Sequence, residues 1–244
     1  MCHDHAVPAT SNGREAEVAT RWGGTVTTRV FAPEGGGPAV VIIPDFFGPS
    51  SFYDHLGALL CEEGFTAVET DPYFRHDEVE LGDAPAAGAR LSGVGDDEAL
   101  SDLQDVRAAA AELAGSSTVG VIGFCAGGTW AMCLAEQPNT PAVSYYGFPL
   151  GLPGDVERVA PLDRVERLRS PLLAFWGDQD QAVGSDAMDR YVAATEDVAT
   201  NVRYPDVGHG FLRGLVEPGS QEAASATEAW QRTVEFLRHH VASG

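Results

Sequence analysis

Lysine is absent from this sequence. The chain has 244 residues, and all 15 of its basic residues are arginine. This absence excludes mechanisms that need a primary amine on a side chain, such as a Schiff base, a phosphate-binding loop with lysine, or a serine–lysine pair. Catalysis by this chain must therefore use other nucleophiles and bases.

Positive charge as a whole is scarce. The 15 arginines are outnumbered by 36 Asp and Glu residues, so the formal net charge is −21. Nucleic acids and anionic membranes are bound through basic patches, and we therefore expect neither as a partner. No apolar run approaches the ~18 residues that a membrane-spanning helix needs. We expect a small molecule as the partner and favour a monomer.

Cysteine is rare as well. The four cysteines are Cys2, Cys61, Cys125 and Cys133. Their spacing matches neither a disulfide framework nor a C-x-x-C zinc or redox site. Residues 1–13 lack the apolar region of a secretory signal, so we expect a cytoplasmic location, where thiols stay reduced. The run from Cys2 to His5 is more typical of a frayed terminus than of a metal site.

Strand-like and helix-like segments alternate along the chain. Six segments are predicted as strands: 39–44, 66–70, 118–124, 142–146, 171–176 and 201–204. Those at 39–44 and 171–176 are continuous apolar runs with the character of buried strands. Residues 19–32 resemble a hairpin that turns at Gly23 and Gly24. The alternation predicts an α/β fold, a doubly wound and mostly parallel sheet with helices on both faces. We find no linker, so we expect a single domain over residues 19–244 after a flexible tail over residues 1–18.

One long segment has no clear periodicity. Residues 78–96 are rich in Gly, Ala and Asp, and we predict a long loop or lid there, because structureless segments of this length often have a function. A helix is predicted at 97–113 from the spacing of its apolar residues, and further helices are predicted at 184–196 and 220–241.

The segment 123–127, GFCAG, lies between a predicted strand and a predicted helix. It has the G-x-S-x-G spacing of a nucleophile elbow, with Cys125 in place of serine. At such a turn the sulfur lies near the helix N-terminus, where the partial positive charge favours a thiolate. The alternative for this motif alone is a glycine-rich turn that contains a buried cysteine.

Reactive side chains follow several of the predicted strands, at the edge where open α/β sheets bind ligands. They are Asp45, Asp71, Arg75, Cys125, Tyr145, Tyr146, Asp178, Asp180 and His209. The order of nucleophile, acid and histidine is that of the α/β-hydrolase triad. In this arrangement Cys125 attacks a carbonyl carbon, His209 moves protons, and either Asp178 or Asp180 orients the imidazole.

Two backbone N–H groups complete the arrangement. Those of Phe46 and Ala126 are the natural oxyanion hole, because one follows a strand and the other follows the nucleophile. Taken singly, each side chain also has an ordinary structural explanation, since aspartate often caps helices and a loop histidine is often a surface residue.

Five segments together resemble the dienelactone hydrolase (carboxymethylenebutenolidase-like) family of the α/β-hydrolase superfamily. They are GFCAGG at 123–128, SYYG at 144–147, GDQDQAV at 177–183, GHGF at 208–211 followed by Arg213, and DPYFR at 71–75. The resemblance covers nearly the whole chain. It selects Asp180 as the acid of a triad with Cys125 and His209.

The resemblance implies hydrolysis of a lactone or ester through an acyl-enzyme, with no cofactor and no metal. It also implies a small anionic substrate, whose carboxylate Arg75 and Arg213 would clamp, with Tyr145 as a further substrate-binding residue. Without the resemblance, a surface ion pair would explain each arginine.

One position departs from the family pattern. The family has a glutamate near the thiol that takes part in activating it, and this chain has Asp45 there. The carboxylate of Asp45 reaches less far by about 1.3–1.5 Å, one C–C bond projected along the chain. We expect Asp45 to act in activation, but not in the way of the longer acid.

Two other functions fit these residues. The same triad can serve thioesterase, cyclase or lyase chemistry in a biosynthetic pathway, and the active-site residues do not separate these reactions from hydrolysis. A hydrolase-like protein can also bind a ligand without catalysis, although no triad residue is missing here. Cys61 and Cys133 are at apolar helix positions and are expected in the core.

Overall fold

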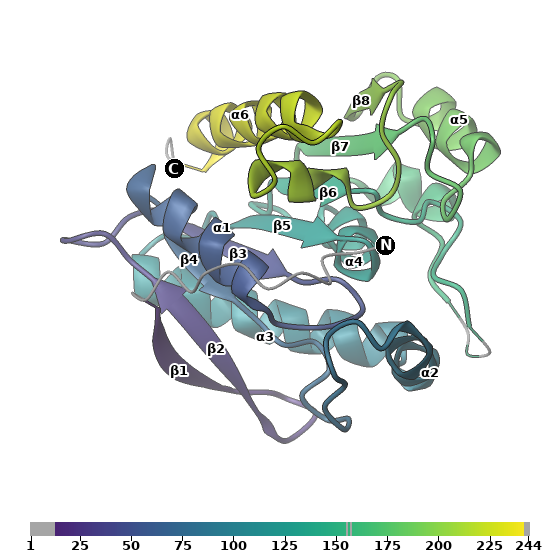
Figure 1. The fold of residues 1–244 in the computed structure, drawn as a ribbon. Coiled ribbons are helices and arrows are strands. Elements are labelled where there is room, and N and C mark those ends of the chain that lie inside the picture. The colour runs from purple at the N-terminus through teal and green to yellow at the C-terminus, as the bar shows by residue number, and fades with distance from the viewer. Residues whose placement is uncertain (1–12, 155, 157, 242–244) are drawn as a thin grey trace.

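An eight-stranded sheet runs through the centre of the molecule (Figure 1). The computed structural model describes residues 13–154, 156 and 158–241. The strands are β1 (Arg14–Ala19), β2 (Thr25–Phe31), β3 (Ala39–Ile43), β4 (Thr66–Glu69), β5 (Gly120–Phe124), β6 (Ala142–Tyr145), β7 (Leu172–Gly177) and β8 (Thr200–Tyr204). Their order across the sheet is β1-β2-β4-β3-β5-β6-β7-β8, and the pairs from β4 to β8 are parallel. The predicted α/β fold with a mostly parallel sheet is confirmed.

Helices cover both faces of this sheet. They are α1 (Ser51–Glu62), α2 (Ala84–Gly93), α3 (Asp96–Ala114), α4 (Ala126–Leu134), α5 (Ser185–Ala194), α6 (Ala223–His240) and the 3-10 segments η1 (Pro161–Arg167) and η2 (Phe211–Leu215). In Figure 1, α1 and α6 lie in front of the sheet and α3 and α4 behind it. Because both faces are covered, every residue of β3 and β5 is buried, which explains their continuous apolar sequences.

The predicted hairpin is present, but it begins earlier than expected. β1 and β2 pair antiparallel, and Gly23 and Gly24 have φ values of 83° and 91° at the turn. β1 starts at Arg14, so residues 14–18 are part of the sheet and not of a tail. The cause is that β1 is an edge strand with three charged side chains, and such a strand looks like a polar terminus in the sequence. The rest of the expected tail, including Cys2 to His5, is outside the described residues.

The segment predicted as a long loop contains a helix. Within residues 78–96, α2 begins after Asp83, whose carboxylate accepts a hydrogen bond from the Ala86 N–H at 3.1 Å. Only Ala87 and Leu91 of α2 are buried, so its apolar periodicity is weak. The signals that mark this helix are the capping aspartate and Pro85 in its first turn, and they outweigh its glycines.

The turn between β5 and α4 has no room for side chains at two positions. A Cβ on Gly123 would lie 2.0 Å from the Gly127 carbonyl oxygen, and a Cβ on Gly127 would lie 2.3 Å from the Ile43 carbonyl oxygen. These contacts are with backbone, which cannot rotate away. Glycine therefore allows α4 to start directly against the ends of β3 and β5.

We expect Gly123→Ala to lower the free energy of unfolding by about 4 kcal/mol or more, because the new methyl group must displace backbone. Urea unfolding followed by circular dichroism measures this. The matched control is Gly93→Ala, because a Cβ on Gly93 would have no neighbour within 4 Å. Alanine there should leave stability unchanged or raise it by up to about 1 kcal/mol, and equal losses in both variants would contradict the packing argument.

Candidate active site

Cys125 occupies the turn between β5 and α4. Its φ is 54° and its ψ is −112°, a left-handed backbone conformation that non-glycine residues rarely adopt. Its backbone N–H donates to the Tyr145 carbonyl at 3.0 Å, and its own carbonyl accepts from the Thr129 N–H at 3.1 Å. These bonds hold the residue between two strands and a helix. The strained turn that the elbow motif predicts is therefore present.

His209 and Asp180 form a buried pair. The Nδ1 atom of His209, in the loop between β8 and η2, lies 2.7 Å from Oδ2 of Asp180, which follows β7. The other oxygen of Asp180 accepts hydrogen bonds from the N–H groups of Ala182 at 2.9 Å and Val183 at 3.0 Å. Both oxygens of this carboxylate are thus occupied, and its orientation toward the imidazole is set by the backbone.

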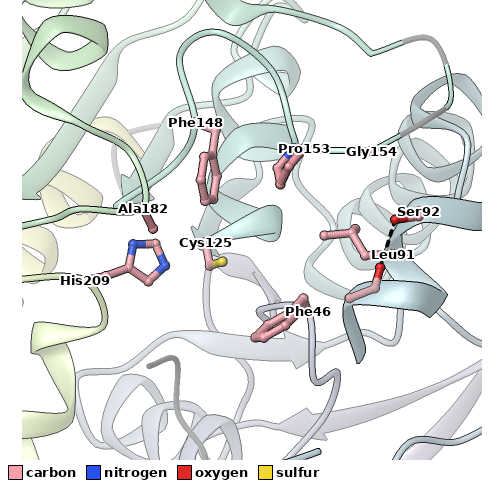
Figure 2. A pocket seen from close by; sticks show the side chains of 10 residues that line it. Phe46, Leu91, Ser92, Cys125, Phe148, Pro153, Gly154, Ala182 and His209 are labelled. Carbon is pink, nitrogen blue, oxygen red and sulfur yellow. Dashed lines mark hydrogen bonds between the residues drawn. The ribbon is translucent and has the colours of Figure 1, made fainter. Parts of the chain in front are cut away.

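Cys125 lies on the other side of this imidazole. In the view of Figure 2, the Cys125 side chain is between His209 on one side and Phe46 and Leu91 on the other. Burial lowers the pKa of His209, but the charge of Cys125 and the hydrogen bonds to Asp180 and Cys125 outweigh it and raise the pKa to about 10. The structure thus brings the three residues of the predicted triad together. With its pKa raised to about 10, the imidazole of His209 is protonated near neutral pH.

The loop after β3 forms a tight turn beside the thiol. The Gly48 N–H donates to the Asp45 carbonyl at 3.0 Å, and the Phe47 N–H donates to Asp45 Oδ1 at 2.9 Å. Within the described part of the chain, the N–H groups of Phe46 and Ala126 donate to no acceptor. Their use as an oxyanion hole stays a prediction.

The buried Asp45 carboxylate caps this turn. It also lies near enough to Tyr73 to affect the phenol: burial raises the pKa of Tyr73 well above its usual range, and the charges of Cys125 and Asp45 raise it further. Asp45, Tyr73 and the thiol are therefore neighbours. Activation of the thiol by Asp45 stays a prediction.

A cavity of about 510 Å³ opens beside Cys125 and His209. Its walls are mainly apolar and come from Phe46, Leu91, Phe148, Pro153 and Ala182, as Figure 2 shows. Gly88, Ser92 and Gly154 complete the lining. Within the described residues, no arginine lines this pocket, so its surface suits an uncharged group.

The two arginines expected to clamp a carboxylate do not line the pocket. Arg75 donates to both oxygens of Asp102, at 2.9 and 3.0 Å, and lies 3.0 Å from Glu98. Arg213 donates to Glu222 at 2.7 Å and is 4.0 Å from Glu217. In a chain so rich in carboxylates, acidic residues of the protein itself occupy both guanidinium groups.

Tyr145 is also placed differently from the expectation. It is buried between the rings of Phe124 and Phe175, whose centroids lie 5.1 and 4.9 Å from its own. Its hydroxyl lies 2.6 Å from Thr233 Oγ1 and donates to the Ala229 carbonyl at 3.2 Å, both on α6. Tyr145 therefore packs β6 against α6 and does not line the pocket.

The sequence reasoning missed the contribution of α2 and of two arginines. Gly88, Leu91 and Ser92 of α2 line the pocket, and Arg90 donates to the carbonyls of Phe46 and Phe47 at 2.9 Å. Arg158 donates to the carbonyls of Leu91 and Val94, each at 2.7 Å. The signals in the sequence for α2 were the cap at Asp83 and Pro85 in the first turn. The arginine contacts have no local signal, since they join distant segments.

Of the other described cysteines, Cys133 is buried as expected, whereas Cys61 is only half-buried. Burial raises the pKa of Cys133 to about 12 and also raises the pKa of Cys61. Among the described residues, no cluster of three His, Cys, Asp or Glu side chains is placed to hold a metal ion. None of the described helices has the length and apolar character needed to cross a membrane.

Comparisons with known proteins place the chain in context. The model of the dienelactone hydrolase family matches residues 26–241. A carboxymethylenebutenolidase of Rhodococcus opacus is 35% identical over 215 residues, covering 86% of this chain and 84% of the relative. Carboxymethylenebutenolidase 2 of Cupriavidus pinatubonensis is 30% identical, covering 93% and 94%. A crystal structure of a Klebsiella pneumoniae protein assigned to the dienelactone hydrolases superposes with a TM-score of 0.81 at 26% identity, covering 92% and 97%.

We expect His209 to titrate at about pH 10 in the unmodified protein. In Cys125→Ala its pKa should fall, because the first of the effects that raise it is removed while burial still lowers it. Asp180→Asn should lower it for the same reason. NMR titration of the imidazole measures both. The signal of His55 is the control, and an unchanged midpoint in Cys125→Ala would show that the sulfur carries no charge beside the ring.

Proposed function

The chain belongs to the dienelactone hydrolase family, and we propose that it hydrolyses a small lactone or ester through a covalent thioester on Cys125. One observation carries the proposal. The Cys125 thiol and the His209 imidazole, which Asp180 holds at 2.7 Å, share the wall of an apolar cavity. A thiolate, a proton donor and a buried orienting carboxylate are the parts that acyl transfer needs.

In the first half of the reaction, the Cys125 thiolate attacks the carbonyl carbon of the substrate. The carbonyl oxygen gains negative charge, which the N–H groups of Phe46 and Ala126 and the N-terminus of α4 stabilise. The intermediate collapses, the C–O bond of the ester breaks, and the His209 imidazolium gives its proton to the departing oxygen. For a lactone, the departing oxygen stays attached to the acyl group.

In the second half, water hydrolyses the thioester. Neutral His209 takes a proton from the water as the oxygen attacks the acyl carbon, and the Cys125 thiolate leaves. The products are a carboxylic acid and the restored thiolate–imidazolium pair. Asp180 accepts a hydrogen bond from Nδ1 throughout and thereby keeps the imidazole in the tautomer that carries a proton on that atom.

We place an uncharged lactone or ester first among the substrates. The cavity is walled by apolar side chains, and the guanidinium groups of Arg75 and Arg213 are held by carboxylates of the protein. The net charge of −21 also repels anions. A lactone that carries a carboxylate is the second candidate, and the names of the relatives favour it.

We expect Cys125→Ala to lower kcat for ester hydrolysis by about 10³-fold or more. In the unmodified protein, mass spectrometry after rapid acid quenching should detect an acyl group on the peptide that contains Cys125. The control is Cys61→Ser, which should keep full activity, because Cys61 is outside the pocket. Hydrolysis that persists in Cys125→Ala would exclude the thioester route.

A pair of substrates of similar size tests the charge preference. The p-nitrophenyl ester of pentanoic acid should have a kcat/KM about tenfold higher than the p-nitrophenyl monoester of succinic acid, which ends in a carboxylate. Arg75→Gln and Arg213→Gln should change both values by less than about twofold. A preference for the succinate ester that either arginine variant abolishes would support the clamp instead.

A further inference from the structure

Arg90 connects two walls of the active-site cavity. It lies on α2, where its neighbour Leu91 lines the cavity. Its Nη2 atom donates to the carbonyl of Phe46 and to the carbonyl of Phe47, both at 2.9 Å. One guanidinium group thus holds two consecutive carbonyls of the turn that follows β3.

This contact fixes the peptide unit next to the expected oxyanion donor. The carbonyl of the Phe46–Phe47 peptide is held by Arg90, and its N–H donates to Asp45 Oδ1 at 2.9 Å. The turn is closed by the bond from the Gly48 N–H to the Asp45 carbonyl. The Phe46 N–H belongs to the preceding peptide unit, so its direction depends on how firmly this turn is held.

The surroundings of Arg90 are unlike those of the arginines in surface ion pairs. Its guanidinium carbon lies 4.2 Å from the centroid of the Tyr73 ring. Tyr73 is itself buried, and its hydroxyl has no hydrogen-bond partner among the described residues. In the described part of the chain, no carboxylate is within 4.0 Å of an Arg90 nitrogen. The guanidinium group of Arg90 therefore interacts with backbone carbonyls and with an aromatic face.

We propose that Arg90 is a positioning residue, which holds the turn from Asp45 to Gly48 so that the Phe46 N–H faces the developing oxyanion. The proposal rests on the proposed function, because it needs a reaction with a tetrahedral oxyanion. Arg90 acts through the turn and does not touch the substrate. Arginine is suited to this task, since a planar fork can bridge two adjacent carbonyls, whereas an ammonium group is a point charge.

The test compares two reactions of the same thiol. Hydrolysis of the p-nitrophenyl ester of pentanoic acid passes through an oxyanion, whereas alkylation of Cys125 by iodoacetamide is a displacement at a saturated carbon and does not. In Arg90→Met, kcat for hydrolysis should fall by about 10- to 100-fold, with KM changed by less than about twofold. The alkylation rate should stay within about twofold of the unmodified protein.

Arg107→Met is the matched control. Arg107 also donates to consecutive backbone carbonyls, those of Pro138 and Asn139, at 3.4 and 3.1 Å. These carbonyls lie just before the amino end of β6, whereas the active site lies at the carboxyl ends of the strands. Its loss should leave kcat and the alkylation rate unchanged. Arg90→Lys keeps the charge but not the fork and should give an intermediate kcat. If Arg90→Met fails to fold, the same measurements are made on Arg90→Lys instead.

Three outcomes would overturn the proposal. An unchanged kcat in Arg90→Met would show that the turn needs no such support. An equal fall in hydrolysis and alkylation would indicate a role in the thiol or in folding. A higher KM for the succinate monoester alone would make Arg90 a substrate-binding residue. Failure of the proposed function has a separate signature, since Cys125→Ala would then keep hydrolysing the ester.

Discussion

At Cys125 the backbones of β5, α4 and β3 approach so closely that Gly123 and Gly127 have no room for a side-chain carbon. The rest of the site depends on this contact. It forces Cys125 into a left-handed conformation and places its sulfur at the carboxyl edge of a central strand. The loops after β3, β7 and β8 meet at the same edge, because parallel strands all end there. Phe46, Asp180 and His209 therefore reach one thiol from three distant parts of the chain.

Arginine has two structural roles in this lysine-free chain. On the acidic surface, Arg75 and Arg213 pair with carboxylates. Arg90, Arg107 and Arg158 instead donate to backbone carbonyls of other segments, and Arg158 also pairs with Asp96. The second role follows from the planar guanidinium, whose several N–H groups can reach two or three carbonyls at once. It gives α2 and the turn after β3 a common support, although α2 buries little apolar surface of its own.

Much of the fold could be predicted because its signals are local. Continuous apolar runs marked central parallel strands such as β3 and β7, and the motif around Cys125 marked the elbow. β1 and α2 were misjudged for related reasons. β1 is a charged edge strand without a fully buried residue, and α2 buries only two side chains, so the apolar signal of both is weak. For the arginines, residue type predicted an ionic contact, but the partner depends on which carboxylates or carbonyls the fold brings within reach.

The sequence by itself determined the order of the reactive residues along the chain, the glycines that the elbow needs, and the segments that must be strands. These follow from covalent spacing and from side-chain volume, both of which are properties of neighbouring residues. Only the tertiary structure decided that Tyr145 packs inside the fold, that Arg75 and Arg213 are held by acidic residues, and that Arg90 supports the turn beside the thiol. Those outcomes depend on residues that are distant in the sequence, and each side chain binds the partner that the fold brings nearest to it.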